Sequence, residues 1–165
     1  MEETRKPRHH WLILYGVAVL VFGLDQISKA ILGAFVRPGE AIAVIPGFFD
    51  IVNVRNRGAA FGFLNRSDMD WQFWLFLIAT LIAIWAILVM ARQGLKKPLL
   101  LSGLGLILGG ACGNLLDRIR FRSVLDFLDF YLGSWHWPAF NVADMGICVG
   151  VFLTCVASLR KAATT

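Results

Sequence analysis

Residues 109–144 read GGACGNLLDRIRFRSVLDFLDFYLGSWHWPAFNVAD, and this stretch joins two long apolar segments through a short polar link. Its carboxylate, amide and guanidinium side chains gather at one end of the two segments: Asn114, Asp117, Arg118, Asp126, Asp129, Asn141 and Asp144. An ionised carboxylate in hydrocarbon costs at least about 2.5–3.5 kcal/mol, so apolar segments normally exclude such groups. The clustering therefore indicates a functional site.

The composition places the chain among membrane proteins. It is 58% hydrophobic and 16% charged, with a mean hydropathy of +0.67, which is too apolar for a soluble chain of 165 residues. A bilayer core needs about 20 apolar residues in a helix. Four segments meet this requirement: roughly 11–33, 71–91, 99–117 and 141–159. The sequence thus predicts an all-α membrane protein with four transmembrane helices in one domain, residues 1–165.

Charge and cysteine content restrict the partners. The formal charge of +5 comes mostly from residues beside the spans, which is typical of contact with membrane lipid headgroups rather than with nucleic acid. The three cysteines, Cys112, Cys148 and Cys155, lie inside predicted spans without CxxC spacing. We interpret them as small packing residues and expect no metal site.

The longest connection, residues 34–70, has a different pattern. Residues 41–56, AIAVIPGFFDIVNVRN, alternate loosely, are rich in Val, Ile and Phe, and are broken at Pro46 and Gly47. This pattern predicts two short strands around a turn, forming a small β element on the membrane surface between helices 1 and 2.

Asp25 and Lys29 lie at i,i+4 near the end of the first span, on one helical face. The pair has two interpretations of equal weight: a self-neutralising pair that reaches the interface, or a support for a site across the bundle.

The third span carries Gly105, Gly109 and Gly113, a GxxxGxxxG series that allows close helix packing. One further step of four residues reaches Asp117, which we therefore expect to face the bundle interior. The alternative for Asp117 is a plain ion pair with Arg118 or Arg120. Likewise, Asp144 could be an acid favoured by the helix N-terminus alone.

Four spans place both termini on one side of the membrane and the polar cluster on the other. The positive charges of the two sides are nearly equal, but every lysine except Lys29 lies on the side of the termini. We therefore expect cytoplasmic termini, with the carboxylates and residues 34–70 near the outer leaflet.

Two neighbouring carboxylates cannot both ionise easily, so they share a proton, and one activates water while the other acts as an acid. The sequence lacks GxSxG and HExxH motifs. Peptide hydrolysis by an Asp pair, without a cofactor, is the leading interpretation. The alternative is a small four-helix transporter or proton relay that uses the same carboxylates.

Five blocks occur in order along the spans and their connections: DQISK (25–29), NRGAAF (56–61), GGACGNLLDR (109–118), VLDF (124–127) and FNVAD (140–144). With these blocks the chain resembles the lipoprotein signal peptidase (signal peptidase II) family over nearly its whole length. The resemblance implies an aspartic endopeptidase of the bacterial inner membrane. Such an enzyme removes signal peptides from diacylglyceryl-modified prolipoproteins by cutting N-terminal to the lipidated cysteine, and we expect it to be monomeric.

The resemblance also implies roles for individual residues. The catalytic pair of the family corresponds to Asp126 and Asp144, whereas spacing alone leaves Asp126 and Asp129 as alternatives. The supporting and substrate-binding residues correspond to Asn56, Gly58, Asn114, Asp117, Arg118 and Asn141. For Asp25 and Lys29 a structural role is expected. Family members often carry Ser where this chain has Met145, a difference that we expect to lie outside the functional positions.

Overall fold

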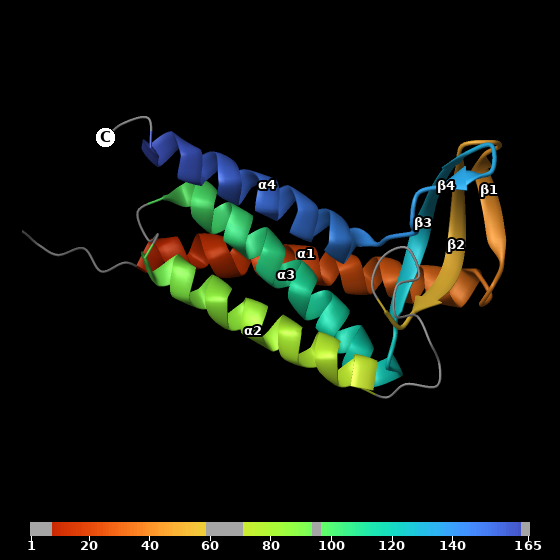
Figure 1. Cartoon of the computed structure of the whole chain (residues 1–165), viewed down its shortest axis with the longest axis horizontal. Coiled ribbons are helices and arrows are strands. Elements are labelled where there is room, and N and C mark those ends of the chain that lie inside the picture. The colour runs from red at the N-terminus through yellow and green to blue at the C-terminus, as the bar shows by residue number, and fades with distance from the viewer. Residues whose placement is uncertain (1–7, 59–70, 94–96, 163–165) are drawn as a thin grey trace, which may run out of the picture.

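Four long helices run side by side, and a small sheet stands across one end of the bundle (Figure 1). This computed structural model describes residues 8–58, 71–93 and 97–162. The helices are α1 (Arg8–Phe35), α2 (Trp71–Gln93), α3 (Pro98–Phe121) and α4 (Val142–Ala162). The strands are β1 (Ala41–Ile45), β2 (Phe49–Asn56), β3 (Val124–Leu132) and β4 (Trp135–His136).

All four predicted spans are confirmed as helices long and apolar enough to cross a membrane. The apolar stretches cover residues 10–35, 71–93, 98–121 and 142–159. The largest difference is at the end of α3, which continues to Phe121 and so keeps Asp117 and Arg118 within the helix. The chain is a multi-pass membrane protein.

Helix α3 is the centre of the bundle and contacts each of the other three helices. Its glycines make this possible, because a Cβ at Gly109 would overlap the backbone of Ala18 on α1. Another step along the same face, a Cβ at Gly113 would lie 2.5 Å from Asp25 Oδ2. The glycine series therefore faces α1, and the expectation that Asp117 points inward is confirmed by its 3% exposure.

The sheet is antiparallel, with strand order β1-β2-β3-β4. Strands β1 and β2 are the two strands predicted between the first and second helices. Strands β3 and β4 were not predicted, and they come from the link between α3 and α4. The β element is thus larger than expected, and it joins both connections at that end of the bundle. Residues 59–70 of the predicted loop, including part of the NRGAAF block, lie outside the described residues.

A tight turn connects α3 to β3. Arg122 adopts a left-handed conformation with φ of 52°, and its N–H donates to the Arg118 carbonyl oxygen at 2.8 Å. This C-terminal cap ends the helix and reverses the chain. Strand β3 then pairs with β2, which carries Asp126 back over the end of α3.

Candidate active site

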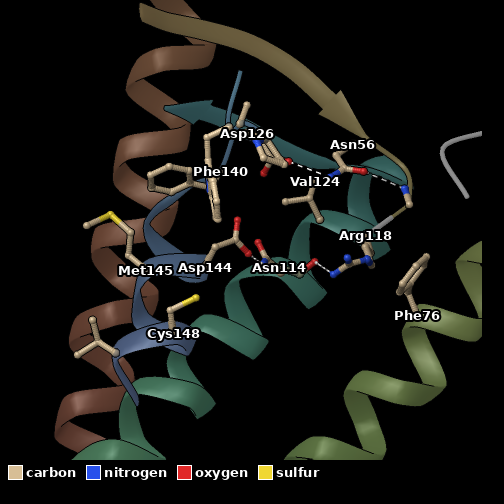
Figure 2. A pocket seen from close by; sticks show the side chains of 15 residues that line it. Asn56, Phe76, Asn114, Arg118, Val124, Asp126, Phe140, Asp144, Met145 and Cys148 are labelled. Atoms are coloured by element: carbon tan, nitrogen blue, oxygen red, sulfur yellow. Dashed lines mark hydrogen bonds between the residues drawn. The ribbon is translucent and has the colours of Figure 1, made fainter. Parts of the chain in front are cut away.

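A cavity of about 660 Å³ lies where α2, α3 and α4 meet the sheet. Figure 2 shows Asp126 and Asp144 on facing sides of this pocket, with Asn114 and Arg118 beside them. Most of the remaining lining is apolar: Phe76, Val124, Trp137, Pro138, Ala139, Phe140, Met145 and Val149. The pocket thus presents a few polar groups in an otherwise apolar wall, which is typical of a binding site.

Asp126 comes from β3 and is 4% exposed. In the sheet register Val124 faces Asn56, so Asp126 and Asn56 are diagonal neighbours on β3 and β2. The Asn56 side-chain amide donates to Asp126 Oδ2 at 3.0 Å, and the Asn141 amide donates to Oδ1 at 2.8 Å. Two amide groups therefore fix the plane of this carboxyl group.

Asp144 lies in the first turn of α4, where Asn141 is the N-cap residue. The Asp144 N–H donates to Asn141 Oδ1 at 3.0 Å, and the Asn141 N–H donates to Asp144 Oδ2 at 3.1 Å. This reciprocal pair is a capping box made with Asn and Asp. The dipole at the helix N-terminus favours the ionised form of Asp144.

Asn114 connects α3 to the other carboxyl group. Its side-chain amide donates to Asp144 Oδ1 at 2.8 Å, while its Oδ1 accepts from Lys29 Nζ at 3.0 Å and from the Asn141 amide at 3.2 Å. Asn114 and Asn141 together join the two carboxyl groups into one network.

The pKa of Asp126 is raised to about 7, mainly because the group is buried and additionally because of the charge of Asp144. The hydrogen bonds from Asn56 and Asn141, and the charge of Lys29, oppose this rise without cancelling it. Asp126 can therefore carry a proton near neutral pH, as one member of a carboxyl pair must.

A buried ion cluster supports the network from behind. Lys29 Nζ lies 2.8 Å from Asp25 Oδ2 and 3.2 Å from Asp117 Oδ2, and all three side chains are at most 5% exposed. The interpretation of Asp25 and Lys29 as an interfacial pair is therefore wrong, because the pair is buried against α3. Among the described residues, Asp117 forms its ion pair with Lys29, and not with Arg118 or Arg120 as the alternative interpretation of the sequence expected.

The same cluster holds the backbone beside each carboxyl group. The N–H of Leu125, next to Asp126, donates to Asp117 Oδ2 at 3.2 Å. The N–H of Ala143, next to Asp144, donates to Asp25 Oδ1 at 2.9 Å. Removing one partner of a buried ion pair leaves an uncompensated charge and costs about 3–5 kcal/mol. Through its hydrogen bonds to the Leu125 and Ala143 N–H groups, the cluster links the position of β3 to that of α4.

The remaining predicted residues also surround the pocket. Asn56 Oδ1 accepts from the Gly58 N–H at 2.9 Å, and both residues line the cavity. The Arg118 guanidinium lies 5.2 Å from the centre of the Phe76 ring and makes one long bond, 3.5 Å, to the Asn114 carbonyl oxygen. The predicted site residues thus lie in the pocket or in the cluster behind it.

The alternative acid, Asp129, lies elsewhere. Its carboxylate is 3.0 Å from Nδ1 of His136 on β4 and does not line the pocket. Sequence reasoning missed Gln26, which donates to Asp117 Oδ1 at 3.3 Å and follows Asp25 directly in the DQISK block. Met145, which we expected to lie outside the functional positions, is among the residues that line the pocket.

The chain is similar to known proteins over most of its length. The family model described as signal peptidase (SPase) II matches residues 17–160. The lipoprotein signal peptidase of Oleidesulfovibrio alaskensis is 59% identical over 150 residues, covering 91% of this chain and 96% of the relative. That of Nitratidesulfovibrio vulgaris is 58% identical and covers 90% of each chain.

Solved structures agree with the sequence relatives. A bacterial membrane enzyme determined at 2.3 Å resolution superposes with a TM-score of 0.79 at 31% identity, covering 90% of this chain and 88% of the other. A second one, at 1.9 Å resolution, gives a TM-score of 0.75 at 32% identity, with coverages of 87% and 90%. With its five blocks, four helices and paired carboxyl groups, this chain belongs to the signal peptidase II family, the lipoprotein signal peptidases, and is a protease.

Proposed function

We propose that this protease cuts diacylglyceryl-modified prolipoproteins N-terminal to the lipidated cysteine, with Asp126 and Asp144 as the catalytic pair. The observation that carries this proposal is that the buried carboxyl group of Asp126 and the half-buried carboxyl group of Asp144 line one pocket whose other walls are mostly apolar. Hydrolysis of a peptide bond needs an acid and a base within reach of one water molecule. A lipidated substrate needs apolar walls beside them.

In this mechanism Asp126 carries the shared proton and Asp144 is the base. Burial raises the pKa of Asp126 to about 7, so this group can supply a proton near neutral pH. Asp144 lies at a helix N-terminus, whose dipole stabilises an anion there, so we assign it the role of base. Asp144 takes a proton from the water, which attacks the carbonyl carbon of the residue before the lipidated cysteine. Asp126 donates its proton to the carbonyl oxygen, which gives a tetrahedral intermediate. Asp144 then gives the proton that it took from water to the amide nitrogen, the C–N bond breaks, and the amine of the cysteine leaves. Asp126 takes back its proton from the hydroxyl group as the new carboxyl group forms.

Arg118 has the best placed free donors for substrate. The side-chain amides of Asn114 and Asn141 already donate to the two carboxyl groups. Among the described residues, the only hydrogen bond of the Arg118 guanidinium is the long one to the Asn114 carbonyl oxygen, so this group can bind a substrate carbonyl or the developing oxyanion. Asn114 and Asn141 position the acid and the base.

The apolar wall gives a place for the lipid and for the signal peptide. Phe76 comes from α2, and Met145, Cys148 and Val149 come from α4, so the pocket extends along the membrane-spanning part of the bundle. Substrate enters laterally between these helices, because a diacylglyceryl group gains nothing by leaving the lipid phase. The polar groups at the end of the helices then meet the scissile bond.

The proposed location is the bacterial inner membrane, with both termini in the cytoplasm and the sheet near the outer leaflet. The chain acts there as a monomeric single membrane domain in contact with lipid. Its supporting features are the four spans and the lysines on the side of the termini.

A cleavage assay tests the proposed substrate. Purified protein is incubated with a precursor peptide whose cysteine carries a diacylglyceryl group, and with the same peptide unmodified. We expect mass spectrometry to detect a product that begins at the lipidated cysteine, with little cleavage of the unmodified peptide. Equal cleavage of both peptides would show that the apolar wall does not select for the lipid.

A small transporter or proton relay remains the alternative. It would require carboxylates near the middle of the bilayer, whereas Asp126 lies on the sheet and Asp144 in the first turn of α4. Proton flux can be measured with a pH-sensitive dye in sealed liposomes that contain the protein. If the protein is only a protease, we expect no proton flux above that of empty liposomes.

A further inference from the structure

We propose that a second pocket, on the α1 side of α3, binds the phosphate group of an anionic phospholipid. This cavity of about 360 Å³ lies between α1, α3, β2 and β3, outside the lining of the active site. Its lining residues are Gln26, Lys29, Ala30, Gly33, Arg55, Asp117, Arg120, Phe121 and Leu125. Figure 1 shows the ends of α1 and α3 that form it beside the sheet.

Two arginines form the cationic part of this pocket. The Arg55 guanidinium, on β2, lies 4.8 Å from the centre of the Phe121 ring, and the Arg120 guanidinium, on α3, lies 5.6 Å from the same ring. Both arginines line the same cavity, and contact with the face of a ring leaves the N–H donors of a guanidinium group available. Within residues 8–58, 71–93 and 97–162, no carboxylate forms an ion pair with Arg55 or Arg120.

The carboxylate in the pocket does not neutralise these arginines. Asp117 is bonded to Lys29 Nζ at 3.2 Å, to the Leu125 N–H at 3.2 Å and to the Gln26 amide at 3.3 Å. The negative charge of Asp117 is therefore balanced within the buried cluster, at the inner end of the pocket. Arg55 and Arg120 are exposed at the outer end and provide the positive charge that an incoming anion meets.

The surroundings favour a lipid over a free phosphate ion. On the adjoining surface of α1, Ile27 and Ile31 are 59% and 51% exposed, and Phe121 on α3 is 52% exposed. In a membrane-spanning helix such side chains face acyl chains. Guanidinium groups above an apolar strip match a phospholipid, whose phosphate and acyl chains are covalently joined. Inorganic phosphate would gain only the polar half of this site.

A bound phosphate would also join two parts of the fold. Arg55 belongs to the sheet and Arg120 to the bundle, so one anion that contacts both holds β2 against the end of α3. Anything that binds the folded state alone raises the melting temperature. We therefore expect phosphatidylglycerol to stabilise the protein more than phosphatidylcholine does.

Native mass spectrometry of the detergent-purified chain tests the site with dioleoyl-phosphatidylglycerol and dioleoyl-phosphatidylcholine as probes. The wild type should retain phosphatidylglycerol preferentially. The double variant Arg55→Gln/Arg120→Gln should bind it roughly ten- to thirtyfold more weakly, as expected for two lost guanidinium contacts. Arg55→Lys/Arg120→Lys, which keeps both charges, should retain part of this affinity.

Arg37→Gln is the matched control, because Arg37 is an exposed arginine outside the pocket that pairs with Glu40. It makes the same change per residue and should leave binding unchanged. The single variants Arg55→Gln and Arg120→Gln are measured beside it. Equal losses of lipid binding in Arg37→Gln and in these two variants would indicate an effect of general surface charge and overturn the proposal. Equal retention of the two lipids by the wild type would overturn it as well. A melting temperature raised as much by sodium phosphate as by phosphatidylglycerol would overturn the lipid assignment. No substrate is present, so these results do not depend on the proposed peptidase mechanism.

Discussion

Asn141 and Asp144 cap each other at the start of α4, since each donates its backbone N–H to a side-chain oxygen of the other, at 3.1 and 3.0 Å. The side-chain amide of Asn141 also donates to Asp126 at 2.8 Å. One asparagine thus begins the helix that carries one carboxyl group and holds the other carboxyl group in place. Helix capping and the geometry of the pair are therefore inseparable at this position.

Asn141→Ala should lower both stability and activity. Loss of an N-cap costs about 0.5–2 kcal/mol, and a displaced catalytic group reduces the rate roughly a hundredfold. The control is Asn53→Ala, because Asn53 is also buried but donates to the Val36 carbonyl oxygen instead. Thermal unfolding and kcat/KM should both fall for Asn141→Ala, whereas Asn53→Ala should lose mainly stability. Similar activity losses in the two variants would remove the special role of Asn141.

The pH dependence follows from the raised pKa of Asp126, which is about 7. The shared proton is present below this value and is lost above it, so kcat/KM should fall about tenfold per pH unit above pH 7. The measurement is a pH–rate profile with a lipidated peptide. Asp129→Asn should show the same fall in kcat/KM above pH 7. A shift of this fall in Asp129→Asn would show that the titrating group is Asp129 and not Asp126.

The same pKa predicts the pH dependence of stability. Because the native state holds the Asp126 proton more tightly than the unfolded state, this stabilisation is fully present below the unfolded pKa. It is lost as pH rises through the native pKa of about 7. Asp126→Asn should therefore melt at a temperature that changes less between pH 5 and 8 than that of the wild type. An unchanged slope would show that Asp126 does not titrate in this range.

Gly109→Leu tests the packing of α3 against α1. A side chain at Gly109 would meet the backbone of Ala18, so overpacking should cost roughly 1–3 kcal/mol and lower the melting temperature in detergent. Gly16→Leu is the control, because a Cβ at Gly16 has nothing within 4 Å. Equal melting temperatures for the two variants would place Gly109 on a lipid-facing surface.

Cysteine labelling tests the proposed orientation. Ser134 is exposed in the turn between β3 and β4, and Gln93 is exposed at the other end of the bundle, at the end of α2. In a background without the three native cysteines, Ser134→Cys should react with a membrane-impermeant thiol reagent in intact spheroplasts. Gln93→Cys should react only after the membrane is opened. The reverse pattern would place the carboxyl groups on the cytoplasmic side.

The helices could be predicted from the sequence because each is a local apolar run, and the contact face of α3 because its glycines recur every four residues. Strand β3 could not, for a physical reason. Its sequence VLDFLDFYL has aspartates three residues apart, so it lacks the two-residue alternation of a half-buried strand. It is a strand because it pairs with β2, whose partners lie from 68 (Asn56 and Val124) to 81 (Phe49 and Phe130) positions earlier, and no local pattern encodes that pairing.

The difference between Asp126 and Asp129 also depends on strand pairing between distant parts of the sequence. From the sequence, Asp126 and Asp129 were equivalent until the family resemblance favoured Asp126. The pairing of β3 with β2 brings Asp126 next to Asn56, while β4 brings His136 to Asp129. Likewise, the i,i+4 spacing of Asp25 and Lys29 predicted their contact, but not the contact of Lys29 with Asp117 on another helix.

Single amide substitutions in the carboxyl groups test the central claim most directly. Purified Asp126→Asn, Asp144→Asn and Asp129→Asn are compared by kcat/KM on the lipidated precursor, with circular dichroism to confirm that each is folded. Because acid and base act as one unit, Asp126→Asn and Asp144→Asn should each lose roughly a thousandfold or more, and Asp129→Asn should keep most of the activity. A folded Asp126→Asn that still cleaves, together with an inactive Asp129→Asn, would contradict the assignment of the pair.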